Sequence, residues 1–494
     1  MKLHLKVIFV FCCCCLLTFL LSDSLSIIKL RPQSVHAWRQ ADCVSYTLNY
    51  YQNNQSFFEP QTHTLVGKNG HAASEFPLLY FITARFYKWF GVHEWFLRAL
   101  NFLIFFIGCL CLLLIGFQFF DNKWLSLVPA LFTFTSPFLY YYGLNFLPDV
   151  PALSLALMGS LFAFKYTRNK NVVLWYVAVL VFSLAMLIKV SAGISFVAFI
   201  GAMAIQQFYT RQSIIPTKHY KHIFTGLFIT VALNICWIAF VVSYNKQSSS
   251  QQNLTGIYPI WDEQIRIILY ICKRTLLYWS LVILNPLFWL LLVAGFFLLV
   301  RKIKAGLLRT FIWLNLVGAV LYSLLWFRAY QHHDYYMINP FVALIWIAFG
   351  ACCVIDLMPL KQLYLNAGMG LLFFLAILYC GKVQTDRYYH FNGEAISADY
   401  YTVEPYLRSI GISRKDIVVS VPDKTPNLTL YFLNQPGWTE AFTWPGNNID
   451  NFVSQGVRYI IVGDSGYLNN PLYAKHMGEK VGSYGSIAIF KIRH

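Results

Sequence analysis

The feature that most constrains this chain is a series of apolar stretches, most of them near 20 residues long, between residues 4 and 381. A helix needs about 20 apolar residues to cross the hydrocarbon core of a bilayer. The first stretch is interpreted as an uncleaved helix, because no good signal-peptide cleavage site follows it. We predict about eleven transmembrane helices, at 4–21, 98–118, 124–142, 150–164, 172–188, 192–208, 222–243, 281–300, 310–327, 337–356 and 363–381.

The composition agrees with a membrane protein. The chain is 58% hydrophobic and 12% charged, whereas soluble domains carry about 25% charged residues. No nucleic-acid-binding motif accompanies the net charge of +17, so we expect no nucleic acid partner and assign the basic loops to lipid head groups. The cysteines lie mostly in apolar stretches and are interpreted as small apolar fillers.

Lysine and arginine in the short loops predict the orientation of the chain. They gather in alternate loops, which face the cytoplasm by the positive-inside rule. This puts the N-terminus in the cytoplasm, and it puts residues 22–97 and the tail from about residue 382 on the extracytoplasmic side. The residues that carry the bias are Lys165, Arg168, Lys170, Arg211, Lys218, Lys221, Arg301, Lys302, Lys304 and Arg309.

The predicted fold class is an all-α polytopic membrane protein with a small C-terminal α/β domain. We place the transmembrane domain at 1–381, with 22–97 as its first outer loop, and the extracytoplasmic domain at 382–494. Within the loop, 78–90 mixes aromatic and basic residues at helical spacing, which suits a helix in the membrane interface; a helix packed under the loop is the alternative. In the tail we predict strands at 416–421, 428–433, 457–462 and 487–492 and helices at 403–410 and 448–455.

The first outer loop holds the leading catalytic candidate, Asp42, in the segment HAWRQAD. A carboxylate here can act as a general base toward a hydroxyl nucleophile. Alone it would more often be a helix N-cap or a solvated loop residue. However, Trp38, Arg39 and Gln40 place an aromatic wall, a cation and an amide beside it. We therefore assign Asp42 as catalytic and Arg39 as substrate-binding.

Glu75, in the segment EFPLLY, is a second acid of the same loop. It is either a substrate-binding residue or the N-terminal charge of the helix that follows Pro77. His71 lies nearby, but two candidate ligands at this spacing are a weak metal signal. A divalent metal ion therefore stays open, and no other cofactor is indicated.

Three further candidates stand at predicted outer ends of spans. Arg98 either snorkels or pairs with a phosphate. Asp149, in LPDVPA, is either a helix N-terminal charge or a functional acid. Lys189, in LIKVSAG, lies about 27 Å along its helix and so at the edge of the hydrocarbon. It either snorkels there or meets a lipid-linked phosphate through its ammonium.

The last outer loop is rich in polar and aromatic residues. It includes Arg328 and the segment HHDYYMINP at 332–340. Adjacent side chains rarely point at one ion, so we favour a polar rim that binds phosphate or sugar hydroxyls over a metal cluster. The substrate-binding candidates here are Arg328, His333 and Tyr335.

Taken together, these segments resemble the GT-C superfamily of polytopic glycosyltransferases. Within it, the chain is most similar to the protein O-mannosyltransferases and the bacterial lipid A aminoarabinose transferase group, and the tail from Thr425-Pro426-Asn427 to Gly437-Trp438 resembles bacterial members. The resemblance rests on the order of the segments along most of the membrane part. There are departures: Ala41 precedes Asp42 where many eukaryotic members have an Asp-Glu pair, and the signature WWDYG is absent.

The resemblance implies a glycosyltransferase (a hexosyl- or pentosyltransferase) in the inner, or plasma, membrane. It would move a sugar from a polyprenyl-phosphate-linked donor to an extracytoplasmic acceptor, which is a glycolipid, a glycan or a protein, by an inverting displacement. Asp42 would match the catalytic base, Lys189 and Arg98 the basic positions near the donor phosphate, and Asp149 the second acidic motif. The alternative is a polytopic transporter or a lipid-linked sugar flippase, but related halves and broken midplane helices, typical of transporters, are not evident.

Overall fold

The computed structural model describes residues 2–210, 214–250, 256–302, 306–359, 361–391, 396–442 and 449–493. Contacts divide the chain into two compact units, which we describe separately. The first comprises Met1–Ile28, Arg98–Ile238 and Thr255–Asp386, and the second Lys29–Leu97, Ala239–Leu254 and Arg387–His494. The predicted first outer loop therefore shares a unit with the C-terminal residues. Arg211, Lys304 and residue 448, which carried predictions above, lie outside the described residues.

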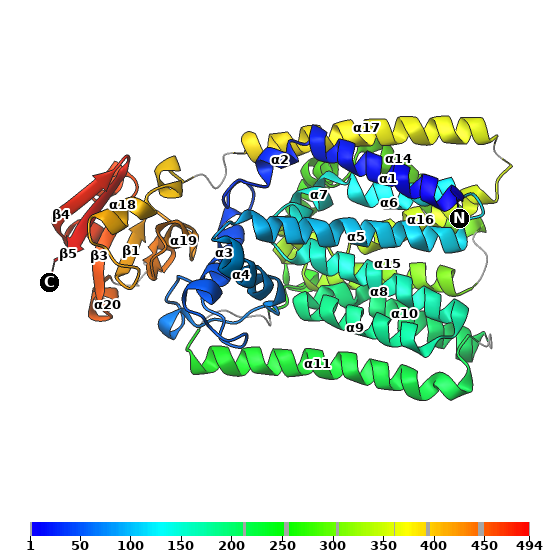
Figure 1. Ribbon diagram of the computed structural model, residues 1–494, viewed down its shortest axis with the longest axis horizontal. Coiled ribbons are helices and arrows are strands. Elements are labelled where there is room, and N and C mark those ends of the chain that lie inside the picture. The colour runs from blue at the N-terminus through cyan, green and yellow to red at the C-terminus, as the bar shows by residue number, and fades with distance from the viewer. Residues whose placement is uncertain are drawn as a thin grey trace. The chain divides into compact units, whose positions relative to one another are not determined.

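The first unit is helical, and its long helices run roughly side by side (Figure 1). The predominance of long apolar helices follows from the apolar stretches, because a helix satisfies its backbone polar groups internally. The helices that lie wholly or mainly in this unit are α1 (Lys2–Leu21), α2 (Ser24–Ile27), α5 (Trp95–Phe119), α6 (Leu127–Phe134), α7 (Pro137–Gly143), α8 (Asp149–Asn169), α9 (Val172–Ile188), α10 (Ile194–Ala204), α11 (Tyr220–Gln247), α12 (Ile265–Arg274), α13 (Ser280–Ile283), α14 (Pro286–Lys302), α15 (Leu307–Leu325), α16 (Val342–Asp356) and α17 (Gln362–Tyr389).

Fewer of these helices reach spanning length than the eleven predicted. In the described chain, seven are long and apolar enough to cross a membrane, and a pair bent by 108° makes an eighth if it counts as one span. Three of the predicted spans, at 124–142, 172–188 and 337–356, correspond instead to shorter apolar helices, Lys123–Phe134, Val172–Ile188 and Val342–Asp356. The seven are Lys2–Leu21, Trp95–Phe119, Asp149–Asn169, Val190–Tyr209, Thr217–Gln247, Leu307–Leu325 and Gln362–Tyr389. The chain is thus a multi-pass membrane protein with broken as well as continuous apolar helices.

Proline accounts for two of the breaks. The predicted span 124–142 is interrupted at Ser136, whose side chain caps α7 just before Pro137. The predicted span 281–300 instead begins at Ile265 and bends before Pro286. Proline is tolerated in the first turn of a helix but removes a backbone hydrogen bond from a helix interior. A new helix therefore begins at each proline.

Small and polar side chains let the helices of the first unit approach closely. Gly108 of α5 faces Ser154 of α8, and a Cβ on the glycine would lie 2.6 Å from the serine Cβ. Ser195 donates a buried hydrogen bond to Asn315 at 2.9 Å. Close approach at small residues and hydrogen bonds between helices are the interactions that hold helices together in lipid.

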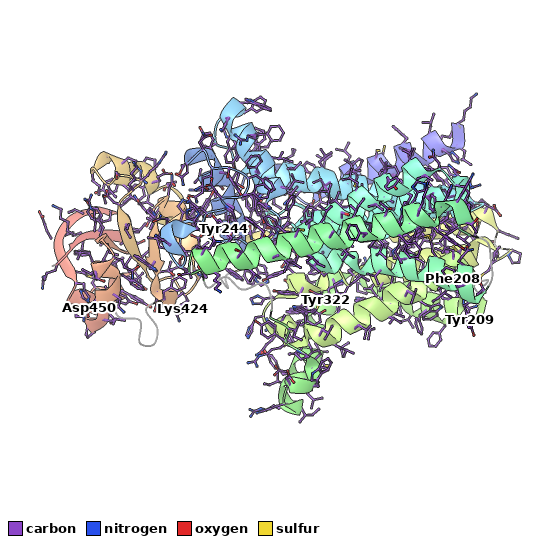
Figure 2. The ribbon with its side chains drawn as sticks, turned by 90° about the horizontal axis from the view of Figure 1, so that it is seen from below. Phe208, Tyr209, Tyr244, Tyr322, Lys424 and Asp450 are labelled. Carbon is purple, nitrogen blue, oxygen red and sulfur yellow. The ribbon has the colours of Figure 1, made fainter. Side chains whose placement is uncertain are left out.

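The span Val190–Tyr209 ends in a π-helical turn, Ile205–Tyr209. The last two side chains, Phe208 and Tyr209, lie at this end of the helix (Figure 2) and are 66% and 86% exposed. Aromatic side chains concentrate at both interfaces between a membrane and water. These two residues therefore mark an interfacial level on the first unit.

The second unit joins the first loop to an α/β fold. Its five-stranded sheet has the order β2-β1-β3-β5-β4, in which β1 is parallel to β2 and β3, and β5 is antiparallel to β3 and β4. The elements of this unit are α3 (Ala37–Gln52), α4 (Leu78–Phe90), α18 (Glu404–Ser409), β1 (Ile417–Val421), α19 (Leu428–Leu433), β2 (Gly437–Thr439), α20 (Ile449–Ser454), β3 (Val457–Val462), α21 (Pro471–Ala474), β4 (Met477–Tyr484) and β5 (Ile487–Ile492).

The predicted strands at 416–421, 457–462 and 487–492 are confirmed as β1, β3 and β5. The strand predicted at 428–433 is wrong, because this segment is the helix α19. Periodicity does not separate a short, fully buried strand from a buried helix, and all six residues of α19 are buried. The strands β2 and β4 were not predicted. Helices were predicted at 403–410 and 448–455, and α18 and α20 lie there.

The first loop pairs with the edge of this sheet. Thr64 forms a parallel bridge with Gly437 of β2, whose N–H donates to the carbonyl of His63 at 3.0 Å. A Cβ at Gly437 would lie 1.9 Å from the carbonyl oxygen of Val418 on β1, so only glycine fits between the two chain segments. The loop thereby covers an edge that would otherwise expose unpaired backbone groups.

The turn before α19 supports a stability prediction. The buried carboxylate of Asp423 accepts hydrogen bonds from the N–H and hydroxyl groups of Thr425 and Thr429, at 2.6 to 2.8 Å. Asp423→Ala leaves these donors without an acceptor, and we expect it to destabilise the protein by about 3 kcal/mol. Thermal unfolding of the purified protein in detergent measures the change. Asp450→Ala, which removes a half-exposed carboxylate, is the control, and equal melting temperatures for both variants would contradict the prediction.

Candidate functional site

The helix α3 (Ala37–Gln52) carries Asp42 in its second turn. The residue before the helix, His36, has a left-handed backbone with φ of +57°. Such conformations persist where the surrounding structure enforces them, and they concentrate at functional sites. Helical spacing of three and four residues then puts Arg39, Asp42 and Tyr46 on one face of α3.

Asp42 is almost completely buried, with 6% exposure. Its Oδ1 accepts a hydrogen bond from Nδ2 of Asn427 at 3.2 Å, and its Oδ2 lies 3.9 Å from a guanidinium nitrogen of Arg39. A buried carboxylate needs hydrogen bonds and nearby positive charge to stay ionised. Asn427 provides a hydrogen bond, and Arg39 provides the positive charge.

Burial raises the pKa of the Asp42 carboxyl to about 6, because removal from water disfavours the charged form. The Arg39 charge and the Asn427 hydrogen bond oppose this rise in pKa, whereas the carboxylates of Glu75 and Asp423 add to it. A general base works best when its pKa lies near the pH at which it operates. Asp42 is ionised at neutral pH and is still basic enough to take a proton.

Arg39 is held in place by Glu75, to which its guanidinium donates a hydrogen bond. The hydroxyl of Tyr80 donates to the same carboxylate at 2.6 Å, and that of Ser74 donates at 2.9 Å. Glu75 therefore fixes Arg39 beside Asp42, whereas no side chain caps the N-terminus of α4. The structure brings these three predicted residues together, and their roles in binding or catalysis stay a prediction.

Asn427 is the residue that the sequence analysis missed at this site. It occupies the N-cap position of α19 and is fully buried, and within the described chain its Oδ1 has no hydrogen-bond partner. The hydroxyl of Thr425 accepts from the N–H of Leu428 at 3.2 Å. Thr-Pro-Asn before an apolar run is a helix-start signal, but no sequence rule links position 427 to position 42.

Two further groups of contacts connect the first loop with α19 and the residue that follows it. The ring of His63 hydrogen-bonds to Ser45 of α3 at 2.7 Å and to Asn434, just after α19, at 3.0 Å. Burial lowers the pKa of His63 to about 4, so the ring is neutral at pH 7. Arg31 pairs with Glu94 at 2.9 Å, and Glu94 also accepts from the hydroxyl of Tyr431 on α19. These contacts fix the position of Asn427 relative to Asp42.

A second cluster of candidates lies in the first unit. Asp149, at the start of α8, forms an ion pair with Lys189 at 2.9 Å. The ammonium also lies over the rings of Tyr335 and Tyr336, 5.7 and 5.4 Å from their centres. These are the distances of cation–π contacts. Asp149, Lys189 and Tyr335, which were separate candidates in the sequence, therefore lie together in the structure. Tyr336 is a further member of this cluster.

The other candidates of the first unit lie around this cluster or on its loops. Arg98 is fully buried, donates to the carbonyl of Leu144 at 3.0 Å and lies 4.2 Å from the ring centre of Phe146. It therefore holds the loop that leads to Asp149. The ring of His333 is 5.4 Å from that of Tyr335. Arg328, with an exposed side chain, pairs with Glu263 at 3.2 Å.

The metal candidates do not form a recognisable centre. The ring of His71 hydrogen-bonds to Tyr244 and to Gln61, and Glu75 bonds to Arg39. Within the described ranges, no group of three or more His, Cys, Asp or Glu residues is arranged to hold a metal ion. No chemical step is therefore assigned to a metal, and a divalent ion stays a prediction.

The Asp149–Lys189 pair allows a test by substitution. Asp149 is 1% exposed, so Lys189→Met leaves a buried charge without its partner, and we expect a loss of about 3 kcal/mol in stability. Asp149→Asn combined with Lys189→Met removes both charges, and we expect it to recover most of that loss. Thermal unfolding in detergent measures both variants. A double variant that is no more stable than Lys189→Met alone would contradict the pairing.

Comparison with known proteins gives one family match and several structural matches. Residues 71–237 match the model of the dolichyl-phosphate-mannose-protein mannosyltransferase family. A search of curated proteins found no match. The structure is similar to ArnT from Cupriavidus metallidurans in the apo state, with a TM-score of 0.61 and 11% identity over 98% of this chain and 97% of that one.

Two other solved structures are also similar to this chain. ArnT from Cupriavidus metallidurans bound to undecaprenyl phosphate matches with a TM-score of 0.60 and 12% identity, over 98% of this chain and 97% of that chain. The arabinofuranosyltransferase AftD from Mycobacteria matches 98% of this chain and 40% of its own length, with a TM-score of 0.54 and 14% identity. The chain therefore shares its fold with the two ArnT structures over nearly its whole length.

Proposed function

We propose that this protein is a membrane glycosyltransferase that moves a sugar from a polyprenyl-phosphate-linked donor to an extracytoplasmic acceptor. The observation that carries the proposal is Asp42, a buried carboxylate with a pKa near 6, held beside Arg39 on a chain with the GT-C fold. The family match over residues 71–237 and the undecaprenyl phosphate bound by ArnT support the class of donor.

The chemistry of the proposed reaction is a single displacement at the anomeric carbon. Asp42 takes the proton from an acceptor hydroxyl as its oxygen bonds to that carbon. The bond between the carbon and the phosphate oxygen breaks on the opposite face, so the configuration inverts and polyprenyl phosphate leaves. A phosphate is a good leaving group without protonation, so no general acid is needed.

Cations stabilise the negative charge that develops on the leaving phosphate. Arg39, beside Asp42, is proposed for this role within the second unit. For the first unit, the family resemblance separately suggests Lys189 and Arg98 as basic positions near a donor phosphate. Lys189 and Arg39 each carry an acidic partner, Asp149 and Glu75. Such partners hold the cations in place before the donor binds, which is what electrostatic preorganisation requires. An extracytoplasmic position of the second unit, with the N-terminus in the cytoplasm, is part of the proposal.

The role of Asp42 is tested by Asp42→Asn, which keeps the shape of the side chain and removes its basicity. We expect transfer to fall by at least about 100-fold while binding of the donor is retained. The assay follows purified protein in lipid with a panel of polyprenyl-phosphate-linked sugars and candidate acceptors by mass spectrometry. Asp464→Asn, which changes an exposed carboxylate of the same unit, is the control. Donor consumption by Asp42→Asn at the wild-type rate would refute the assignment, and flux without any change in glycan bonds would indicate a transporter.

The pKa of Asp42 predicts the pH dependence. The carboxylate acts as a base only when ionised, so the rate should fall as the pH drops through about 6. Asn427→Leu removes a hydrogen bond that lowers this pKa, so the midpoint of the acid limb should move upward by roughly one pH unit. Rates measured from pH 4.5 to 8.5 give the midpoint. Asn451→Leu, on the exposed surface of α20, should leave it unchanged. A lower plateau without a moved midpoint would mean that Asn427 is only structural.

A further inference from the structure

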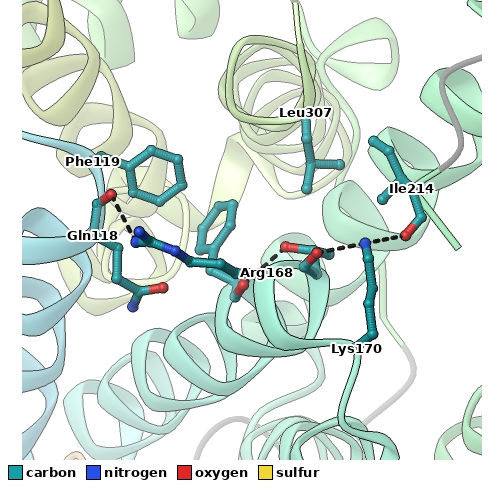
Figure 3. A pocket seen from close by; sticks show the side chains of 8 residues that line it. Gln118, Phe119, Arg168, Lys170, Ile214 and Leu307 are labelled. Carbon is teal, nitrogen blue, oxygen red and sulfur yellow. Dashed lines mark hydrogen bonds between the residues drawn. The ribbon is translucent and has the colours of Figure 1, made fainter.

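A cavity of about 410 Å³ lies in the first unit (Figure 3). None of its lining residues belongs to the clusters described above. Its lining comes from the C-terminal ends of α5 and α8, whose N-terminal ends carry Arg98 and Asp149. It therefore belongs to the opposite end of these helices. Ligand-binding pockets commonly have volumes of about 300–1,000 Å³. The lining residues are Gln118, Phe119, Phe164, Thr167, Arg168, Lys170, Ile214 and Leu307.

The polar part of this lining includes two cations, Arg168 and Lys170. Arg168 donates to the carbonyl of Gln118 at 3.3 Å, and Lys170 donates to the carbonyls of Thr167 and Ile214 (Figure 3). These bonds leave further N–H groups of both cations for a ligand, because a guanidinium has five donors and an ammonium three. Among the residues that line the cavity there is no Asp or Glu. Two cations in a lining without acids favour an anionic ligand, such as a group with several phosphate oxygens.

The other wall of the cavity is apolar. The rings of Phe119 and Phe164 meet edge to face at 5.1 Å between centres, and Leu307 completes this wall. Phe119 is 38% exposed, so the cavity reaches the surface. A ligand that fits both walls has an anionic head and an apolar body.

The cavity also lies at the level of a membrane–water interface. The spans Trp95–Phe119 and Asp149–Asn169 end at it, and Leu307–Leu325 begins at it. The span that precedes Ile214 ends with the exposed aromatic residues Phe208 and Tyr209 (Figure 2). Phosphate groups of lipids occupy this level, and each basic residue close to an anionic membrane surface adds to the attraction.

From these observations we propose that this cavity is a binding site for the phosphate head group of an anionic membrane lipid. Arg168 and Lys170 supply the positive charge that attracts the phosphate, and the lipid body lies against the apolar wall of Phe119, Phe164 and Leu307. The site is separate from the catalytic proposal, and its test does not need the enzymatic activity.

Native mass spectrometry of the full-length protein, with lipid added to the detergent, tests the proposal. We expect retention of one phosphatidylglycerol in preference to phosphatidylcholine. The combined change Arg168→Gln and Lys170→Gln should lower its occupancy by about tenfold. Leu307→Trp fills the cavity without changing charge, and it should give a similar loss. Lys218→Gln, which removes an exposed cation that does not line the cavity, should leave binding unchanged.

Three results would overturn the proposal. One is equal retention of phosphatidylcholine and phosphatidylglycerol by the wild type. Another is unchanged occupancy in both cavity variants, provided that they fold as judged by thermal unfolding. The last is displacement of the lipid by millimolar inorganic phosphate, because the site would then take soluble phosphate rather than a lipid head group.

Discussion

The buried carboxylate of Asp42 is the constraint on which the second unit depends. A charge removed from water must be compensated by hydrogen bonds and opposite charge, or it loses its ionisation. The compensation comes from distant parts of the chain, because Arg39 lies on α3 and Asn427 stands at the N-terminus of α19. Glu75, which precedes α4, holds Arg39 in place. The packing of α19 against α3 is therefore part of the catalytic proposal. The C-terminal residues do more than follow a membrane domain, since one of them contacts the proposed base.

The same physical rule applies within the first unit. Asp149 and Lys189 are brought together where α8 begins and α9 ends, and two tyrosine rings cover the ammonium. Arg98 holds the loop before α8 through a backbone carbonyl and an aromatic ring. In each unit an acidic and a basic candidate form an ion pair, Glu75 with Arg39 and Asp149 with Lys189. In both, the paired groups include residues for which the sequence allowed either a structural or a functional role.

Much of the fold could be predicted because membrane helices and strands rich in β-branched residues leave strong local signals. Apolar stretches of helical length predicted the helices, and alternating or apolar runs predicted β1, β3 and β5. The errors have local causes. Pro137 and Pro286 begin new helices inside predicted spans, and the six residues of α19 form a buried helix whose composition also fits a strand. The sheet edge at Gly437 depends on an approach of Thr64 that no local pattern indicates.

By itself, the sequence determined the membrane class, the approximate positions of the helices and the chemical types at the proposed site. These follow from hydropathy over about 20 residues and from side-chain chemistry, both of which are local properties. Only the tertiary structure decided which groups meet. It paired Asp149 with Lys189, placed Glu75 on Arg39 and brought Asn427 to Asp42 across 385 positions of sequence. It also set the pKa of Asp42, because desolvation depends on everything packed around the carboxylate and not on its neighbours in the chain.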